Sequence, residues 1–164
     1  MKMKRLWALL LVGALALSLV ACSNTDNGGS GGDGSGQTDA VDDLTLSEVL
    51  EKIQKDVELP MVGEMEVTDE NFAGYFFIDP IEGAETLVSE AMINAVAHSV
   101  CLIRVPEGTD AAQVAADIEK NADPRKWICV EAEKTVVKTR GRTVLLVMST
   151  TDTTDAIVEN FDAI

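Results

Sequence analysis

The sequence predicts an α+β domain over residues 44–164: an antiparallel sheet of about four strands with helices on one face. Helical apolar periodicity alternates there with short runs of β-branched residues, and turn residues separate paired runs. Val105-x-x-x-Thr109-Asp110 and Val147-x-x-x-Thr151-Asp152 also have the same spacing between the end of a strand and the start of a helix. We therefore expect two hairpin–helix units after an N-terminal helix.

The N-terminal helix is predicted to begin at Thr45, because Thr45-Leu-Ser-Glu48 is a capping box. An apolar stripe follows it and Pro60 ends the helix. Asp69 is expected to cap a short second helix. The predicted strands cover 85–92, 97–105, 135–139 and 143–149, with turns at residues 79–83 and 140–141. Two further helices are expected to begin near Asp110 and Asp152.

Residues 1–22 form a leader with three cations followed by an apolar run from Leu6 to Ala21. As a helix this run would be about 24 Å long, short of the roughly 30 Å needed to cross a bilayer. A positive segment, an apolar core and small residues are typical of a secretory signal peptide, predicted here over residues 1–21.

Leu19-Val20-Ala21-Cys22 at the end of this run resembles a bacterial lipobox. The resemblance implies that Cys22 carries a diacylglyceryl group and becomes the N-terminus, anchoring the protein to the outer face of the bacterial cytoplasmic membrane. The alternative is an ordinary signal peptide or a marginal anchor, with Cys22 an incidental thiol. Residues 22–43 are rich in Gly, Ser and Asp, which predicts a solvated tether with a mean reach of about 25 Å.

The chain is acidic, with a net charge of −15, which becomes −18 once the three cations of the leader are removed. Such a charge repels nucleic acid and anionic lipid head groups, so we expect no nucleic-acid partner. After Cys22, two cysteines remain, Cys101 and Cys129. An extracytoplasmic domain permits a disulfide between them, but both lie among aliphatic residues, where free thiols also pack well.

Four of the aromatic residues lie close together, at 72 and 75–77. Phe72, Tyr75 and Phe76 have helical spacing, so they share one face of the predicted second helix. Exposed, this face would be a binding surface. The alternative, which we favour, is that the rings anchor the core of a domain with few aromatics.

The sequence contains no recognisable catalytic or metal-binding motif, and no cofactor is expected. His98 is the only histidine, and on a strand it points away from Ser99 and Cys101 because both separations are odd. A distant partner for His98 stays open. Arg140 and Arg142 could hold an anion, although turn arginines are more often solvated, and Arg140 could also protect an edge strand.

The lipobox, the tether, the helix from Thr45, the order Tyr75…Ile78-Asp79 and the final strand Gly141–Val147 together resemble bacterial lipoproteins of domain-of-unknown-function family 4358. The resemblance covers about Leu44 to Ile164. It implies an extracytoplasmic lipoprotein with this architecture and supplies no activity.

These features predict a non-enzymatic interaction module of the cell envelope, held at the membrane by Cys22 and contacting an envelope protein. The contact would use an open sheet edge or the region around Phe72 and Tyr75. The alternative is a lipoprotein that binds a small ligand or wall fragment, for example as a component that serves a transporter, and an enzyme is the third choice.

Overall fold

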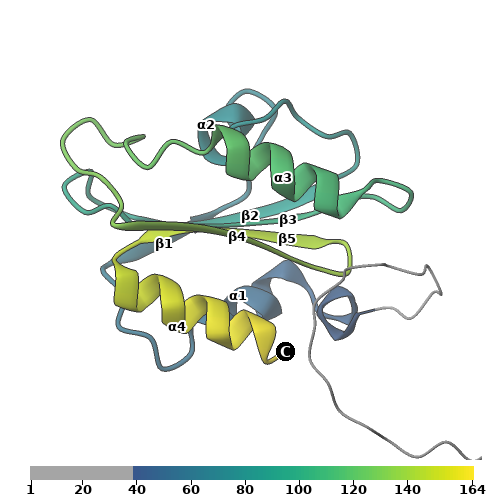
Figure 1. Ribbon diagram of the computed structural model, residues 1–164, viewed down its shortest axis with the longest axis horizontal. Coiled ribbons are helices and arrows are strands. Elements are labelled where there is room, and N and C mark those ends of the chain that lie inside the picture. The colour runs from purple at the N-terminus through teal and green to yellow at the C-terminus, as the bar shows by residue number, and fades with distance from the viewer. Residues whose placement is uncertain (1–38) are drawn as a thin grey trace, which may run out of the picture. The chain divides into compact units, whose positions relative to one another are not determined.

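Five strands form one antiparallel sheet in the computed structural model, which describes residues 39–164 (Figure 1). The strand order is β1-β2-β3-β5-β4, so the two edges are β1 and β4. The strands are β1 (Val62–Met65), β2 (Glu85–Ala91), β3 (Ser99–Arg104), β4 (Lys134–Arg140) and β5 (Thr143–Ser149). The helices are the 3-10 turn η1 (Ala40–Asp43), α1 (Leu46–Gln54), α2 (Phe72–Phe76), α3 (Ala111–Asn121) and α4 (Thr151–Asp162).

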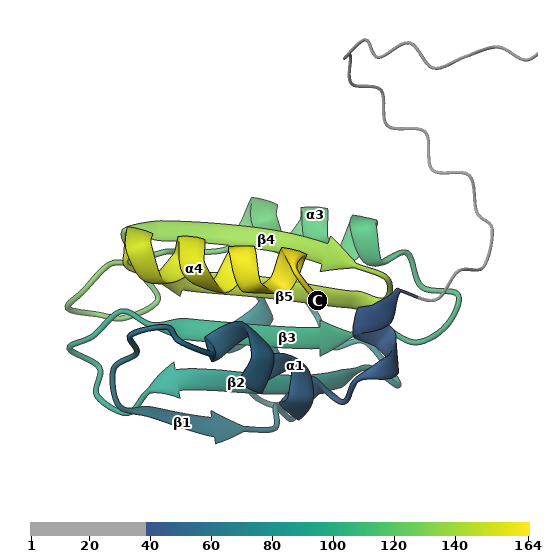
Figure 2. The ribbon, with the colours of Figure 1, turned by 90° about the horizontal axis from the view of Figure 1, so that it is seen from below.

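The α+β class, the antiparallel sheet and the two hairpin–helix units, β2-β3-α3 and β4-β5-α4, are confirmed. The sheet has one strand more than the predicted four. The additional strand is β1, which the sequence does not indicate because it is only four residues long and contains Gly63. The expectation that the helices lie on one face is wrong. Helices α2 and α3 cover one face, and α1 and α4 cover the other (Figures 1 and 2).

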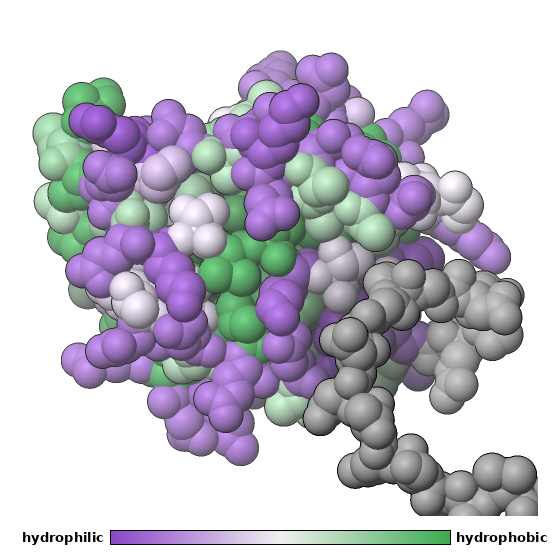
Figure 3. All heavy atoms as spheres, viewed as in Figure 1, coloured by the Kyte–Doolittle hydropathy of each residue, from purple (hydrophilic) through white to green (hydrophobic). Residues whose placement is uncertain are grey.

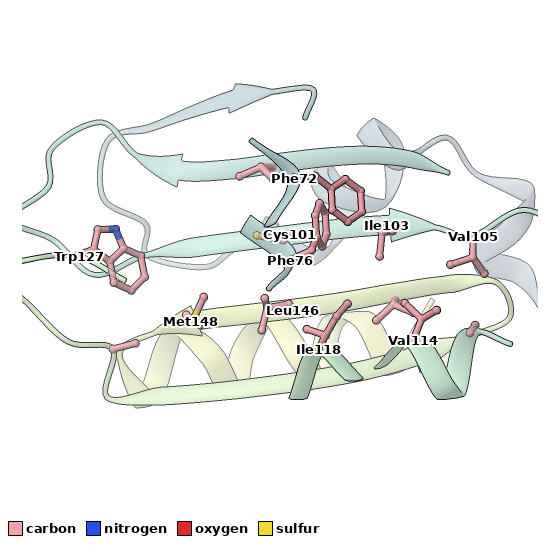
Figure 4. Close-up of a cluster of buried hydrophobic side chains, with 14 residues drawn as sticks. Phe72, Phe76, Cys101, Ile103, Val105, Val114, Ile118, Trp127, Leu146 and Met148 are labelled. Carbon is pink, nitrogen blue, oxygen red and sulfur yellow. The ribbon is translucent and has the colours of Figure 1, made fainter. Parts of the chain in front are cut away.

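The two-sided arrangement follows from the central strands, where every residue of β3 and β5 is buried. A strand that is apolar at consecutive positions needs cover on both faces of the sheet. The α2/α3 core takes Cys101 and Ile103 from β3, with the helix residues shown in Figure 4. The α1/α4 core takes the alternate residues Val100 and Leu102. The side-chain period of 2 therefore divides one apolar run between two cores.

The predicted helix starts are largely confirmed. Thr45 and Glu48 form the capping box, with Thr45 N donating to Glu48 Oε2 at 2.8 Å. Asp110 caps α3 by accepting from two backbone amides. Thr150, rather than Asp152, caps α4, and α1 ends at Gln54, before Pro60. The cap predicted at Asp69 is wrong, because the chain enters α2 at Asn71 without a side-chain cap.

The folded domain begins earlier than the predicted boundary at Leu44. Val41 is fully buried, and the carboxylate of Asp42 accepts the backbone N–H of Arg142 at 2.9 Å and the hydroxyl of Thr143 at 3.1 Å. The guanidinium of Arg104 donates to the carbonyls of Val41 at 2.9 Å and Leu44 at 2.7 Å. The end of the predicted tether is thus bound to the domain, and residues 1–38, including Cys22, lie outside the described residues.

Gly141 in the β4–β5 turn explains how η1 approaches so closely. Its φ is +53°, and a Cβ atom there would overlap the side chains of Asp42 and Asp39. A residue without a Cβ is required for both the left-handed backbone and the close contact. Within residues 39–164, no helix is both long and apolar enough to span a membrane.

Candidate functional site

The aromatic face of α2 divides between core and surface. Phe72 and Phe76 are buried, and their ring centroids are 4.8 Å apart within the α2/α3 core (Figure 4). Their role as a binding surface is therefore wrong, and the core alternative holds. Tyr75 is partly exposed and lines a pocket of about 570 Å³, which we call the Tyr75 pocket.

The Tyr75 pocket contains a nearly buried ion pair between β2 and the α3–β4 connection. Lys126 Nζ lies 2.8 Å from Glu90 Oε1 and also donates to Ser99 Oγ at 3.1 Å. The indole N–H of Trp127 donates to the same carboxylate oxygen at 3.1 Å. Strand β2 and the α3–β4 connection, which are distant in the sequence, thus meet at Glu90, and sequence patterns gave no means of predicting this contact.

The electrostatics of this pocket are set by the ion pair. Lys126 Nζ lies 4.8 Å from the ring centroid of Tyr75 and 4.9 Å from that of Trp127, a cation–π arrangement. Burial, followed by the charge of Glu90, raises the pKa of Tyr75, so its phenol stays protonated and contacts Met65 Sδ at 3.2 Å. The ammonium of Lys126 and the carboxylate of Glu90 are already paired with each other, so the pocket offers a ligand mainly its aromatic rings.

Next to this pocket, large apolar side chains are exposed on three connecting loops. The exposed fractions are 77% for Met61, 65% for Met92, 60% for Ile93 and 100% for Ile128. Met61 and Met92 lie side by side, since the amide of Met92 donates to the carbonyl of Met61 at 3.0 Å. Figure 3 shows apolar side chains gathered where the α3–β4 and β2–β3 connections project. We call these four residues the apolar end.

The apolar end and η1 lie at opposite ends of the sheet. The β2–β3 connection joins the end where Glu90 pairs with Ser99, and the register continues from Ser99 to Met148. At the other end Arg104 pairs with Thr143, whose hydroxyl contacts Asp42 of η1. The chain therefore enters the domain on the side away from the apolar end.

Comparison with known proteins adds no relative. No family model, curated protein or solved structure matches this chain. The resemblance to lipoproteins of domain-of-unknown-function family 4358 stays a prediction, and the site is interpreted from its own chemistry.

Cys101 and Cys129 are both free thiols, so of the two possibilities that the sequence left open, the disulfide is not formed. Cys101 is buried in the α2/α3 core, and burial raises its pKa to about 11, so it is a protonated, unreactive packing residue. Cys129 is exposed and lines the Tyr75 pocket. The two cysteines occupy different environments, and the spacing between them carried no information about this.

His98 is fully buried just before β3, with Nδ1 2.9 Å from Ser149 Oγ. The neighbours Ser99 and Cys101 indeed contact each other, at 3.3 Å, while the histidine's partner is distant in sequence. The pair is unsuited to nucleophilic catalysis: the hydroxyl is buried, and burial lowers the pKa of the imidazole to about 4, which makes it a weak base. Within residues 39–164, no cluster of three or more His, Cys, Asp or Glu could hold a metal ion.

The pKa of His98 predicts a pH dependence of stability. The unfolded chain has an ordinary histidine near 6.5, so between pH 6.5 and 4 it binds more protons than the folded protein. The free energy of unfolding should therefore fall as the pH falls through this window, by about 3 kcal/mol in total from this group. Denaturant titrations at several pH values measure the slope. The variant His98→Gln should show a slope smaller by this contribution, and equal slopes would contradict the prediction.

Arg140 and Arg142 bind groups of their own chain. Arg140 pairs with Asp39 at 2.9 Å and donates to the carbonyl of Phe161 at 2.9 Å. Arg142 donates to the carbonyl of Val105 at 3.2 Å. These contacts favour a structural role over the anion-binding alternative. On edge strand β4, Lys134 and Lys138 also pair with acids of α4, Asp155 and Asp162.

Proposed function

We propose that this chain is a non-enzymatic interaction module, anchored through Cys22 to the outer face of the bacterial cytoplasmic membrane, and that its apolar end binds an envelope protein. The observation that carries the proposal is the exposure of Met61, Met92, Ile93 and Ile128 on neighbouring loops. Large exposed apolar side chains that gather in one place typify interaction surfaces. The adjacent Tyr75 pocket is large enough to receive an anchoring side chain of the partner.

The charge of the chain favours a protein partner over a membrane or a second copy. At a net charge of −15 for the full chain, or −18 without the leader, the protein is repelled by anionic lipid and by its own copies. A partner with an apolar patch flanked by basic residues complements both properties of this surface. The chain also enters the domain at the opposite end of the sheet, so an anchored domain can turn the apolar end away from the membrane.

The sheet edges are the weaker alternative for the contact. Edge strand β1 has only four residues, and a strand this short offers few backbone groups to an added strand. Edge strand β4 has its lysines paired with α4. The loops of the apolar end have no such internal partner for Ile128, which is fully exposed.

The test is site-specific photocrosslinking on intact cells. A photoreactive amino acid at Ile128 should give a reproducible protein adduct, identified by mass spectrometry. The same amino acid at Lys120, an exposed position on α3, is the matched control and should not give that adduct. Adducts to lipid alone, to a second copy of this chain, or to no protein would each overturn the proposal.

A further inference from the structure

A second pocket, independent of the proposed function, lies between the α1–β1 connection and the start of α4. It measures about 510 Å³, and we call it the His98 pocket, because the imidazole of His98 lines it. Its charged lining residues are all acidic: Asp56, Glu58 and Asp152. Among the described residues, none of these three carboxylates forms an ion pair.

A buried polar atom of His98, one of the residues that line this pocket, also has no partner. His98 Nε2 is inaccessible and forms no hydrogen bond, while Nδ1 contacts Ser149 Oγ. An unpaired buried nitrogen costs about 1–3 kcal/mol, so its retention needs a reason. With the proton on Nδ1 and donated to Ser149, Nε2 keeps an unused lone pair, which favours a positively charged group over an anion on this side of the pocket. The lowered pKa of His98 keeps the ring neutral at neutral pH.

The start of α4 would by itself favour an anion in this pocket, but two of its first three amides are already occupied. The N–H of Thr151 donates to Glu133 Oε2 at 3.0 Å, and that of Thr153 donates to Thr150 Oγ1 at 3.4 Å. The positive end of the helix is thus capped from within the chain, and three carboxylates outweigh a partial charge of about one half. The pocket therefore selects for positive charge.

The remaining lining narrows the class of cation. The carboxylates do not converge closely enough to hold a metal ion within the described residues. Between them lie partly buried aliphatic side chains, among them Val57, Leu59 and Val96. Apolar walls with charged groups at the rim fit a long methylene chain that ends in a charged head. We propose that the His98 pocket binds a primary ammonium group carried on an aliphatic chain, as in a lysine side chain or a diamine.

The backbone conformation of Asp56 determines which substitution can test its charge. Its φ is +59°, in the left-handed region that non-glycine residues adopt rarely, although Asp and Asn tolerate it. Here it belongs to a type II turn, in which the N–H of Val57 donates to the carbonyl of Gln54 at 3.2 Å and whose third position also accepts Asn. The same property makes Asp56→Asn a conservative test, because the substitution removes the charge and keeps the backbone preference.

The experiment is an NMR titration of the full chain with 1,5-diaminopentane. The chain has a single histidine, so one set of ring signals reports on the pocket directly. We expect saturable shifts of these signals with the diamine and none with the uncharged 1,5-pentanediol. The triple variant Asp56→Asn/Glu58→Gln/Asp152→Asn should bind the diamine at least about tenfold more weakly. Each lost ion pair between a carboxylate and an ammonium group of the diamine should weaken binding by up to about fivefold.

Asp117→Asn/Glu119→Gln on α3, outside the pocket, is the matched control and should bind like the unchanged protein. Equal shifts with the diol, unchanged binding by the triple variant, or no saturation by the diamine would each overturn the assignment. None of these outcomes bears on crosslinking at Ile128, so this proposal and the proposed function fail separately.

Discussion

Replacing Arg104 by leucine is expected to lower the free energy of unfolding by about 3–5 kcal/mol, because it removes one partner of a buried ionic network. The guanidinium lies 3.8 Å from the carboxylate of Asp42 and donates to Thr143 Oγ1 at 3.1 Å. It also satisfies the carbonyls of Val41 and Leu44. In Arg104→Leu these groups lose their donors while Asp42 keeps a buried negative charge. Urea titration of the variant against the unchanged protein measures the loss.

Arg125→Leu is the matched control for this prediction. Arg125 also faces a carboxylate, that of Glu131 at 3.9 Å, but both side chains are largely exposed. An exposed pair contributes about 0–1 kcal/mol, so the control should leave stability nearly unchanged. Similar losses in both variants would show that burial of the Arg104 network does not determine its contribution.

Phe76→Ala is expected to destabilise the domain by about 3–5 kcal/mol, the range for emptying a fully buried aromatic site. The ring packs against Phe72 and the sheet face formed by β3 and β5 (Figure 4). Truncation leaves a cavity in the core. Because α2 is only five residues long, few other side chains of this helix can offset the loss. Thermal unfolding followed by circular dichroism provides the measurement.

The matched control is Ile128→Ala, which also truncates a large apolar side chain. Ile128 is 100% exposed, so its removal should change the free energy of unfolding by no more than about 0.5 kcal/mol. The difference in stability between the two variants therefore measures the effect of burial. If Phe76→Ala unfolded at the same temperature as the control, α2 would not be part of the core.

Local sequence signals predicted the secondary structure well. The capping box at Thr45 and the cap at Asp110 depend on residues within one turn, and both helix starts are confirmed. The distribution of helices over two faces was also readable in principle, since the runs SVCLIR and TVLLVMS are apolar at nearly every position. Strand β1 was not predicted, because Val62–Met65 is short, contains Gly63 and is only partly buried.

Contacts between distant segments account for what the sequence could not show. Strand β2 and the α3–β4 connection lie side by side, which brings Glu90 together with Lys126 and Trp127. No spacing in the sequence predicts this contact. The contact between His98 and Ser149 depends on the β3–β5 register, which pairs Ser99 with Met148. The neighbours of Val41 are polar and predict a tether, but its side chain packs in the α1/α4 core and its carbonyl accepts from Arg104, far away in the chain.

The attachment of η1 has a mechanical consequence. A pull on the chain before Asp39 reaches the domain first through Arg140, bound to Asp39 at 2.9 Å, and then through the contacts of Asp42 with the β4–β5 turn. These contacts lie at the end of two paired strands and involve several ionic groups that must separate together. Under load they act as a clamp, so force entering at this point is resisted before the first helix of the domain can be drawn away.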